Sequence, residues 1–127
     1  YFTILTTDIE PENPIDFKGK IFLLTDNNVY SAADEFALFC KDSKWGTVIG
    51  ESSSGGGISL DPIILSLPNS GYIVRFPREL GLNKDFTINE EKGTEPDIHI
   101  DPTIGESYEE DKAIQKVLEL VNEQSHN

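Results

Sequence analysis

The sequence of 127 residues contains no methionine and only one cysteine. The single thiol, Cys40, cannot form an internal disulfide or a metal cluster, and because it lies in an apolar helical stretch we expect it to pack in the core. No apolar run approaches the roughly 18 residues of a membrane-spanning helix, so no membrane insertion is expected. No signal-peptide pattern opens the chain. Since translation starts at methionine, we expect a longer protein.

Basic residues are scarce: ten lysines and arginines stand against 23 acidic residues, which gives a formal net charge of −13. Such a surface repels phosphate backbones and anionic lipids, so a nucleic-acid partner or a membrane-surface role is not expected. The acidic residues also serve solubility. The length is that of one domain, residues 1–127, which is large enough to bury a core.

The first half of the chain predicts strands around one helix. The apolar run Lys20–Thr25 is too short for a helix and predicts a strand buried on both faces, as does Thr47–Ile49. The mixed β-branched and aromatic segment Tyr1–Thr7 predicts an earlier strand. Between Ser31 and Asp42 the helical spacing predicts an apolar face and a polar face. The apolar face holds Ala32, Phe36, Phe39 and Cys40, and the polar face holds Asp34, Glu35 and Lys41.

The second half predicts a hairpin and a closing helix. Ile63–Leu67 and Tyr72–Phe76 flank the turn residues Asn69–Gly71, Glu79–Lys92 is predicted to be mostly loop, and Ile98–Ile100 a short strand. Ser107 and Glu110 form a capping-box pattern, followed by an apolar stripe of Ile114, Val117, Leu118 and Val121. This order of elements favours the α/β class, with α+β as an alternative.

Ser31 is the first candidate for chemistry, because it stands between a strand and a helix. The free amides at a helix N-terminus favour negative charge, so the Ser31 N–H and the next one could face a developing oxyanion. The small residues Ala32 and Ala33 leave room for a substrate. The alternative is structural: Ser31 followed by Asp34 is also an ordinary helix N-cap.

Two further segments carry polar or flexible residues. In Gly50–Gly57, three consecutive glycines permit positive φ and close approach to a ligand, but no Gly-Lys-Ser/Thr follows, so the segment is not a phosphate loop. A flexible turn is the alternative. In Asn89–Asp97 the acids could orient a base or face water.

The three segments together resemble one family. Tyr-Ser-Ala-Ala-Asp-Glu-Phe, then Val-Ile-Gly-Glu with a glycine-rich loop, then Gly-Thr-Glu-Pro-Asp-Ile are similar in order and spacing to the C-terminal processing (tail-specific) serine peptidases, over about Lys18–Ile100. The resemblance implies a crotonase-like or ClpP-like β-β-α architecture. It also implies Ser31 as nucleophile, Ala32 as oxyanion donor and Gly55–Gly57 as substrate-binding residues.

The chain departs from the processing branch of that family. A lysine of the glycine-rich loop is the general base there, and it would fall at Gly56, so a Ser-Lys dyad through this loop is excluded. The tricorn-like branch takes its base from an upstream histidine and completes the site with a glutamate, which maps to Glu90, with Glu91 as second choice. No histidine precedes Ser31, and we expect His99 and His126 to be structural or solvated.

The resemblance implies a serine-type endopeptidase that acts on polypeptides. These residues would be the C-terminal portion of its catalytic domain, and the base and a second oxyanion donor would come from an upstream segment, so the fragment alone should be inactive. No cofactor or metal is implied. An exported or cell-envelope location is typical of the family, and a truncated fold with an apolar face would tend to form a homodimer. The alternatives are an inactive ligand- or peptide-binding module on the same fold, and a structural role.

Overall fold

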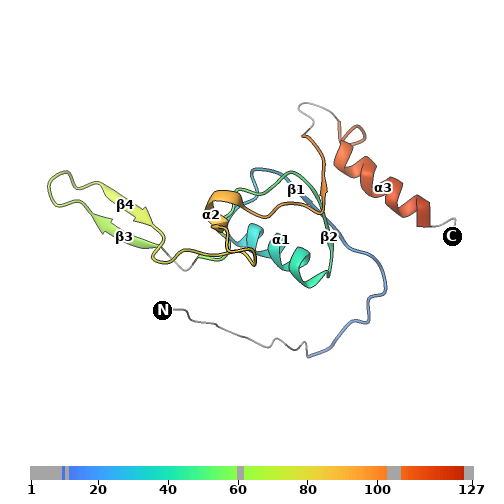
Figure 1. Cartoon of the computed structure of the whole chain (residues 1–127), viewed down its shortest axis with the longest axis horizontal. Coiled ribbons are helices and arrows are strands. Elements are labelled where there is room, and N and C mark those ends of the chain that lie inside the picture. Colours follow the sequence, from blue (N-terminus) through green and yellow to red (C-terminus); the bar gives the residue numbers. More distant parts are fainter. Residues whose placement is uncertain (1–9, 11, 60–61, 103–106, 125–127) are drawn as a thin grey trace.

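The computed structural model describes residues 10, 12–59, 62–102 and 107–124, and its centre is a parallel sheet (Figure 1). Strands β1 (Phe22–Thr25), β2 (Thr47–Gly50) and β5 (Ile98–His99) lie in the order β1-β2-β5. Parallel neighbours need a crossover connection, and α1 (Ala32–Ser43) provides it between β1 and β2. The mixed α/β fold is therefore confirmed, whereas the predicted strand Tyr1–Thr7 lies outside the described residues.

The core is small and centred on β2. Val48 and Ile49 are fully buried, together with Ala37 and Cys40 of α1, so the packing role predicted for Cys40 is confirmed. The prediction that β1 is buried on both faces is wrong, because Leu24 is 41% exposed. In the described sheet β1 is an edge strand with α1 and α3 as its covering helices.

Helix α1 forms where the spacing predicts it, but its buried face differs. The buried side chains are Asp34, Ala37 and Cys40, whereas Phe36 and Phe39 are about half exposed (46% and 51%). The prediction of Asp34 on a solvated face is therefore wrong. The two phenylalanine rings stack on each other and pack against Trp45 on the outer side of the helix, with centroids 6.0–6.2 Å apart. Because Asp34 has buried hydrogen-bond partners, the helix turns this carboxylate inward.

The predicted hairpin is present and stands apart from the core (Figure 1). Strands β3 (Ile63–Ser66) and β4 (Ile73–Phe76) are antiparallel, with Ile64 opposite Arg75. Every residue of both strands is exposed. No third strand pairs with them among the described residues. A two-stranded hairpin of this kind is marginally stable by itself in water.

The last two helices refine the sequence predictions. One turn of helix, α2 (Asn89–Lys92), ends the segment predicted to be mostly loop. Helix α3 (Lys112–Gln124) begins later than the predicted capping box. The Ser107 amide and hydroxyl bond to Glu110 in a preceding turn, while the Asp111 carboxylate accepts the amides of Ala113 and Ile114 at 2.8 and 3.1 Å. Asp111 is therefore the residue that caps α3.

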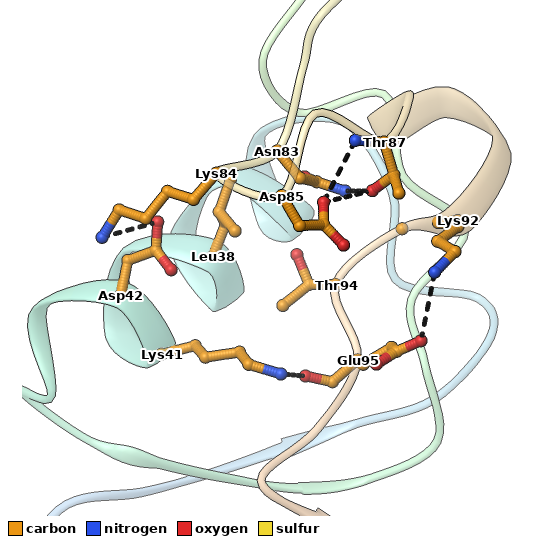
Figure 2. A pocket seen from close by; sticks show the side chains of 11 residues that line it. Leu38, Lys41, Asp42, Asn83, Lys84, Asp85, Thr87, Lys92, Thr94 and Glu95 are labelled. Atoms are coloured by element: carbon orange, nitrogen blue, oxygen red, sulfur yellow. Dashed lines mark hydrogen bonds and ion pairs between the residues drawn. The ribbon is translucent and has the colours of Figure 1, made fainter.

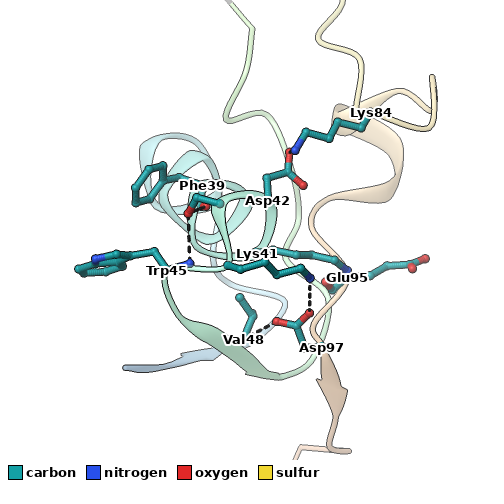
Figure 3. Close-up of polar contacts among 10 residues, drawn as sticks. Phe39, Lys41, Asp42, Trp45, Val48, Lys84, Glu95 and Asp97 are labelled. Atoms are coloured by element: carbon teal, nitrogen blue, oxygen red, sulfur yellow. Dashed lines mark hydrogen bonds and ion pairs between the residues drawn. The ribbon is translucent and has the colours of Figure 1, made fainter. Parts of the chain in front are cut away.

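The Pro-Asp motif has a structural role at the start of β5. Figure 3 shows the Asp97 side chain against β2, where its carboxylate accepts the Val48 amide at 3.0 Å. The Asp97 amide in turn donates to the Val48 carbonyl at 2.8 Å, and Lys44 lies 3.6 Å from the other carboxylate oxygen. These bonds fix β5 beside β2 and so set the position of the segment before it, which includes Glu90.

Candidate active site

Ser31 occupies a strained turn between β1 and α1. Its φ of 57° and ψ of −134° lie in a region that residues with a Cβ rarely adopt, and such strain clusters at functional sites. In α/β-hydrolases a sharp strand-to-helix turn exposes the nucleophilic serine. Ser31 is exposed and its hydroxyl makes no capping hydrogen bond. The side chain therefore does not act as the N-cap that the sequence offered as an alternative.

The amides around Ser31 differ in availability. The Ser31 N–H donates to the Gly55 carbonyl at 3.0 Å, so the expectation that this N–H faces an oxyanion is wrong. The Ala32 N–H has no hydrogen-bond partner among the described residues, and it points from the positive end of α1. The amide to which the resemblance assigns the oxyanion role is thus free of protein partners among the described residues.

Ser31 and Glu90 line one cavity of about 360 Å³. The other lining residues come from the glycine-rich loop and from the ends of the hairpin: Gly56, Ser59, Pro62, Arg75, Phe76 and Pro77. Both carboxylate oxygens of Glu90 are buried, and neither has a hydrogen-bond partner among the described residues. Glu91, the second choice for the acidic position, is exposed and does not line the cavity. Of the two glutamates, only Glu90 therefore shares the cavity with Ser31.

The three glycines of the loop have different surroundings. A Cβ at Gly55 would overlap the backbone of Asn89, and one at Gly57 would overlap the start of α1 at Glu35. Gly56 has a φ of 76° and open space where a Cβ would be, and it alone of the three lines the Ser31 cavity. Gly55 and Gly57 therefore hold the loop close to its neighbours, while Gly56 faces the site.

A buried polar network fixes the glycine-rich loop against α1. Asp34 is fully buried; one carboxylate oxygen accepts the Ser53 hydroxyl and the other accepts the Gly57 amide at 3.2 Å. The Ser53 hydroxyl also accepts the Thr94 amide at 2.7 Å, and the Asn89 side chain accepts the Gly57 amide at 3.0 Å. A satisfied buried network rigidifies its surroundings, so Asp34 sets the loop that bonds to Ser31. Sequence reasoning missed this role because Asp34 fits the polar side of a helix equally well.

Glu90 supplies the one carboxylate among the described residues of the cavity. No histidine or lysine is among the described residues that line it. His99 is exposed and lies 3.2 Å from Asp101, which fits the solvated role predicted for it, while His126 lies outside the described residues. No group of three histidine, cysteine or acidic residues that could hold a metal occurs in the described part of the chain. Burial raises the pKa of the Cys40 thiol, which makes this thiol a poor nucleophile.

Figure 2 shows a second cavity, of about 220 Å³, on the far half of α1. Its charged groups are paired within the protein: Lys84 bonds Asp42 at 3.1 Å, and Lys41 donates to the Glu95 carbonyl at 2.5 Å. Hydrogen bonds from the Thr87 hydroxyl and amide lower the pKa of Asp85. No serine or cysteine is among the described residues that line this cavity, whereas Ser31 lines the larger one. None of the described helices is long and apolar enough to span a membrane.

Comparisons with known proteins agree with the mixed α/β fold. No curated protein matches the sequence significantly. The fold is similar to that of the tricorn protease (TM-score 0.64, 22% identity, 87% of this chain and 11% of that one) and to mature CPAF complexed with lactacystin (TM-score 0.60, 23% identity, 70% and 17%). The chain thus spans only a small part of these proteins. The sequence profile of peptidase family S41 matches residues 5–100. The chain belongs to peptidase family S41.

Proposed function

We propose that this chain carries the nucleophile of a serine-type endopeptidase, with Ser31 as the attacking residue. The observation that carries the proposal is the shared cavity: an exposed serine in a strained turn faces the same space as a buried glutamate that lacks a partner. Serine hydroxyls need a base to become nucleophiles at neutral pH. The proposal therefore includes a histidine from a segment outside the 127 residues.

Glu90 is the group that would hold such a histidine. A buried carboxylate without a hydrogen bond is costly, and an imidazole N–H would satisfy it. The second ring nitrogen would then face the Ser31 hydroxyl, which is the arrangement of a catalytic triad. Glu90 would keep the ring in the correct tautomer and stabilise the imidazolium that forms.

The proposed reaction is an acyl transfer through Ser31. The histidine takes the Ser31 proton, the Oγ atom attacks a peptide carbonyl, and the Ala32 N–H with a second donor from outside the chain stabilises the oxyanion. The tetrahedral intermediate collapses when the histidine protonates the leaving amine, and water then releases the acyl group. Removal of one oxyanion donor typically costs about 100- to 1,000-fold in rate. These 127 residues alone should therefore show negligible peptidase activity.

The finer assignments belong to the same proposal. The parallel sheet with a serine at the start of its crossover helix supports a crotonase-like or ClpP-like β-β-α architecture. The missing side chain at Gly56 and the acidic Glu90 favour the tricorn-like branch of the tail-specific peptidases. An extended polypeptide is the proposed substrate, and an exported or cell-envelope location is proposed from the family alone.

The test is covalent labelling of the full-length protein with a fluorophosphonate probe. We expect the label on Ser31 and its loss in Ser31→Ala. The control is Ser59→Ala, because Ser59 lines the same cavity with a buried hydroxyl that lacks a described partner, and this variant should still be labelled. Equal labelling of wild type and Ser31→Ala would contradict the proposal. Because mature CPAF has been crystallised with lactacystin, we also expect lactacystin to compete with the probe.

A second candidate function is a catalytically inactive binding module. It is favoured by one observation, the absence of a histidine or lysine among the described residues of the cavity. The full-length sequence separates the two functions, because the peptidase requires a histidine and a glycine-rich turn before these residues. A protein without them that binds peptides equally well as wild type and as Ser31→Ala would be a binding module.

A further inference from the structure

Among the described residues, Arg75 is the one cationic side chain that lines the Ser31 cavity. It lies on β4, opposite Ile64, and its neighbours Phe76 and Pro77 line the same space. Its guanidinium makes no ion pair or hydrogen bond with the described residues. The other arginine, Arg78, pairs instead with Glu79 at 3.5 Å. In a chain with 23 acidic residues, the cavity thus presents a cation that the protein itself leaves without a partner.

The two charged residues of the cavity lie at different depths. The carboxylate oxygens of Glu90 are buried, whereas Arg75 belongs to an exposed strand. The Glu90 carboxylate thus lies within the protein, and Arg75 lies nearer its surface. Pro62, Phe76 and Pro77 add apolar surface to the same space, and apolar surroundings strengthen a charge-assisted hydrogen bond.

We infer that Arg75 forms a subsite for a carboxylate group of the substrate, close to the bond that Ser31 attacks. A guanidinium presents a planar fork of donors that matches a carboxylate with two parallel hydrogen bonds. The carboxylate has two sources, an aspartate or glutamate side chain or the free C-terminus of a peptide. The inference rests on the proposed function for its catalytic consequence, but the binding itself can be measured without catalysis.

The first experiment measures binding to full-length protein that carries Ser31→Ala, so that no peptide is cleaved. Three fluorescent peptides that differ only at one position and at the C-terminus are compared by anisotropy. The first has glutamate and an amidated C-terminus, the second has glutamine and an amidated C-terminus, and the third has glutamine and a free C-terminus. We expect the glutamate peptide or the free-acid peptide to bind about tenfold to a hundredfold more tightly than the amidated glutamine peptide, the size of an added charge-assisted hydrogen bond. The arm that shows the gain identifies the source of the carboxylate.

The variants then assign this preference to Arg75. Arg75→Gln should abolish it, Arg75→Lys should retain part of it, and Arg75→Glu should favour a peptide with lysine at the same position. Arg78→Gln is the matched control, because Arg78 lies three residues further along and does not line the cavity, and it should leave the preference unchanged. Such a charge-reversal outcome cannot come from a merely structural defect.

Two outcomes would overturn the inference: equal binding of the acidic and neutral peptides, or a preference that persists in Arg75→Gln. Fluorophosphonate labelling of the protein with Arg75 intact gives a separate answer. If Ser31 is labelled but the Ser31→Ala protein shows no carboxylate preference, the Arg75 subsite is removed and the peptidase proposal stands. A carboxylate preference without labelling of Ser31 supports the Arg75 subsite and removes the peptidase proposal.

Discussion

The sheet with α1 and the β3–β4 hairpin are opposite kinds of structure within one chain. Around β2 the side chains of Val48 and Ile49 are fully buried, and even polar groups such as Asp34 are enclosed and hydrogen-bonded. In the hairpin every strand residue is exposed. Yet the Ser31 cavity draws its lining from both regions. Ser31 therefore lies beside the packed region, and Arg75 of the same cavity lies in the hairpin.

The packed region and the hairpin meet different requirements of the proposed reaction. The proposed acyl transfer requires Ser31, Ala32 and Glu90 to be held in a fixed geometry, since catalysis depends on groups positioned in advance. A hairpin with few packing constraints can change its sequence at low cost in stability. The difference between the regions can be tested by mutations of equal chemistry placed in each.

The largest effect is expected for Ile49→Ala. Removal of a fully buried isoleucine side chain should cost about 2–5 kcal/mol, because Ile49 pairs with β1 and β5 and packs under α1. The matched change Ile64→Ala in the hairpin, where the side chain is 69% exposed, should stay within about 0.5 kcal/mol. Urea unfolding of both variants measures the difference, and similar costs would erase the contrast between the two regions.

Asp34→Asn should have the next largest effect. An amide cannot accept from both Ser53 and Gly57 as the carboxylate does, so a buried donor loses its partner at a cost of about 1–3 kcal/mol. The glycine-rich loop should loosen as well, and fluorophosphonate labelling of Ser31 should slow. Asp42→Asn on the same helix is the control, since its pair with Lys84 is at the surface and is worth less than about 1 kcal/mol. If both variants behave alike, the buried network does not position the site.

Helix α3 should show an intermediate response. Asp111→Ala removes the acceptor of two amides at the helix start and should cost about 1 kcal/mol with a loss of helical circular dichroism. Ser107→Ala, four residues earlier in the turn, should cost only a few tenths. The reverse order of effects would restore Ser107 as the cap, as the sequence predicts.

The smallest effect concerns the pH dependence of the buried thiol. Because burial raises the pKa of Cys40, the unfolded chain loses the thiol proton first, above about pH 8.5. The stability that Cys40 confers is thus fully present below that pH and declines as the pH rises. The difference in unfolding free energy between wild type and Cys40→Ser should be constant from pH 6 to 8 and shrink at pH 9.5. A constant difference over the whole range would place the thiol in contact with water.

The regular elements could be predicted from the sequence because they depend on local patterns. The apolar runs at β1 and β2, the turn residues of the hairpin and the helical spacing after Ser31 each specify a structure within a few residues. What faces the core could not be predicted in the same way. Asp34 is buried and Phe36 is half exposed, which is the opposite of what the helical spacing predicts. The reason is that Asp34 forms hydrogen bonds with Ser53 and Gly57, which lie about twenty residues further along.

Three of the residues that the sequence analysis singled out, Ser31, Gly56 and Glu90, line one cavity, but their contacts could not be predicted from the sequence. Ser31 and Glu90 are 59 positions apart in the sequence and line one cavity in the structure. From the sequence, only the resemblance to a family connected the two residues. The bond from the Ser31 amide to Gly55 and the arrival of Arg75 from the hairpin depend on how distant segments meet. No periodicity or capping pattern carries that information.

The single tryptophan gives this protein a built-in optical reporter. Trp45 lies just beyond the end of α1, with its indole in contact with the rings of Phe36 and Phe39. Any loosening of α1, which begins directly after Ser31, would separate these rings and alter the fluorescence emission of Trp45. Light emitted at the far end of the helix can thus register events at the serine without an added dye.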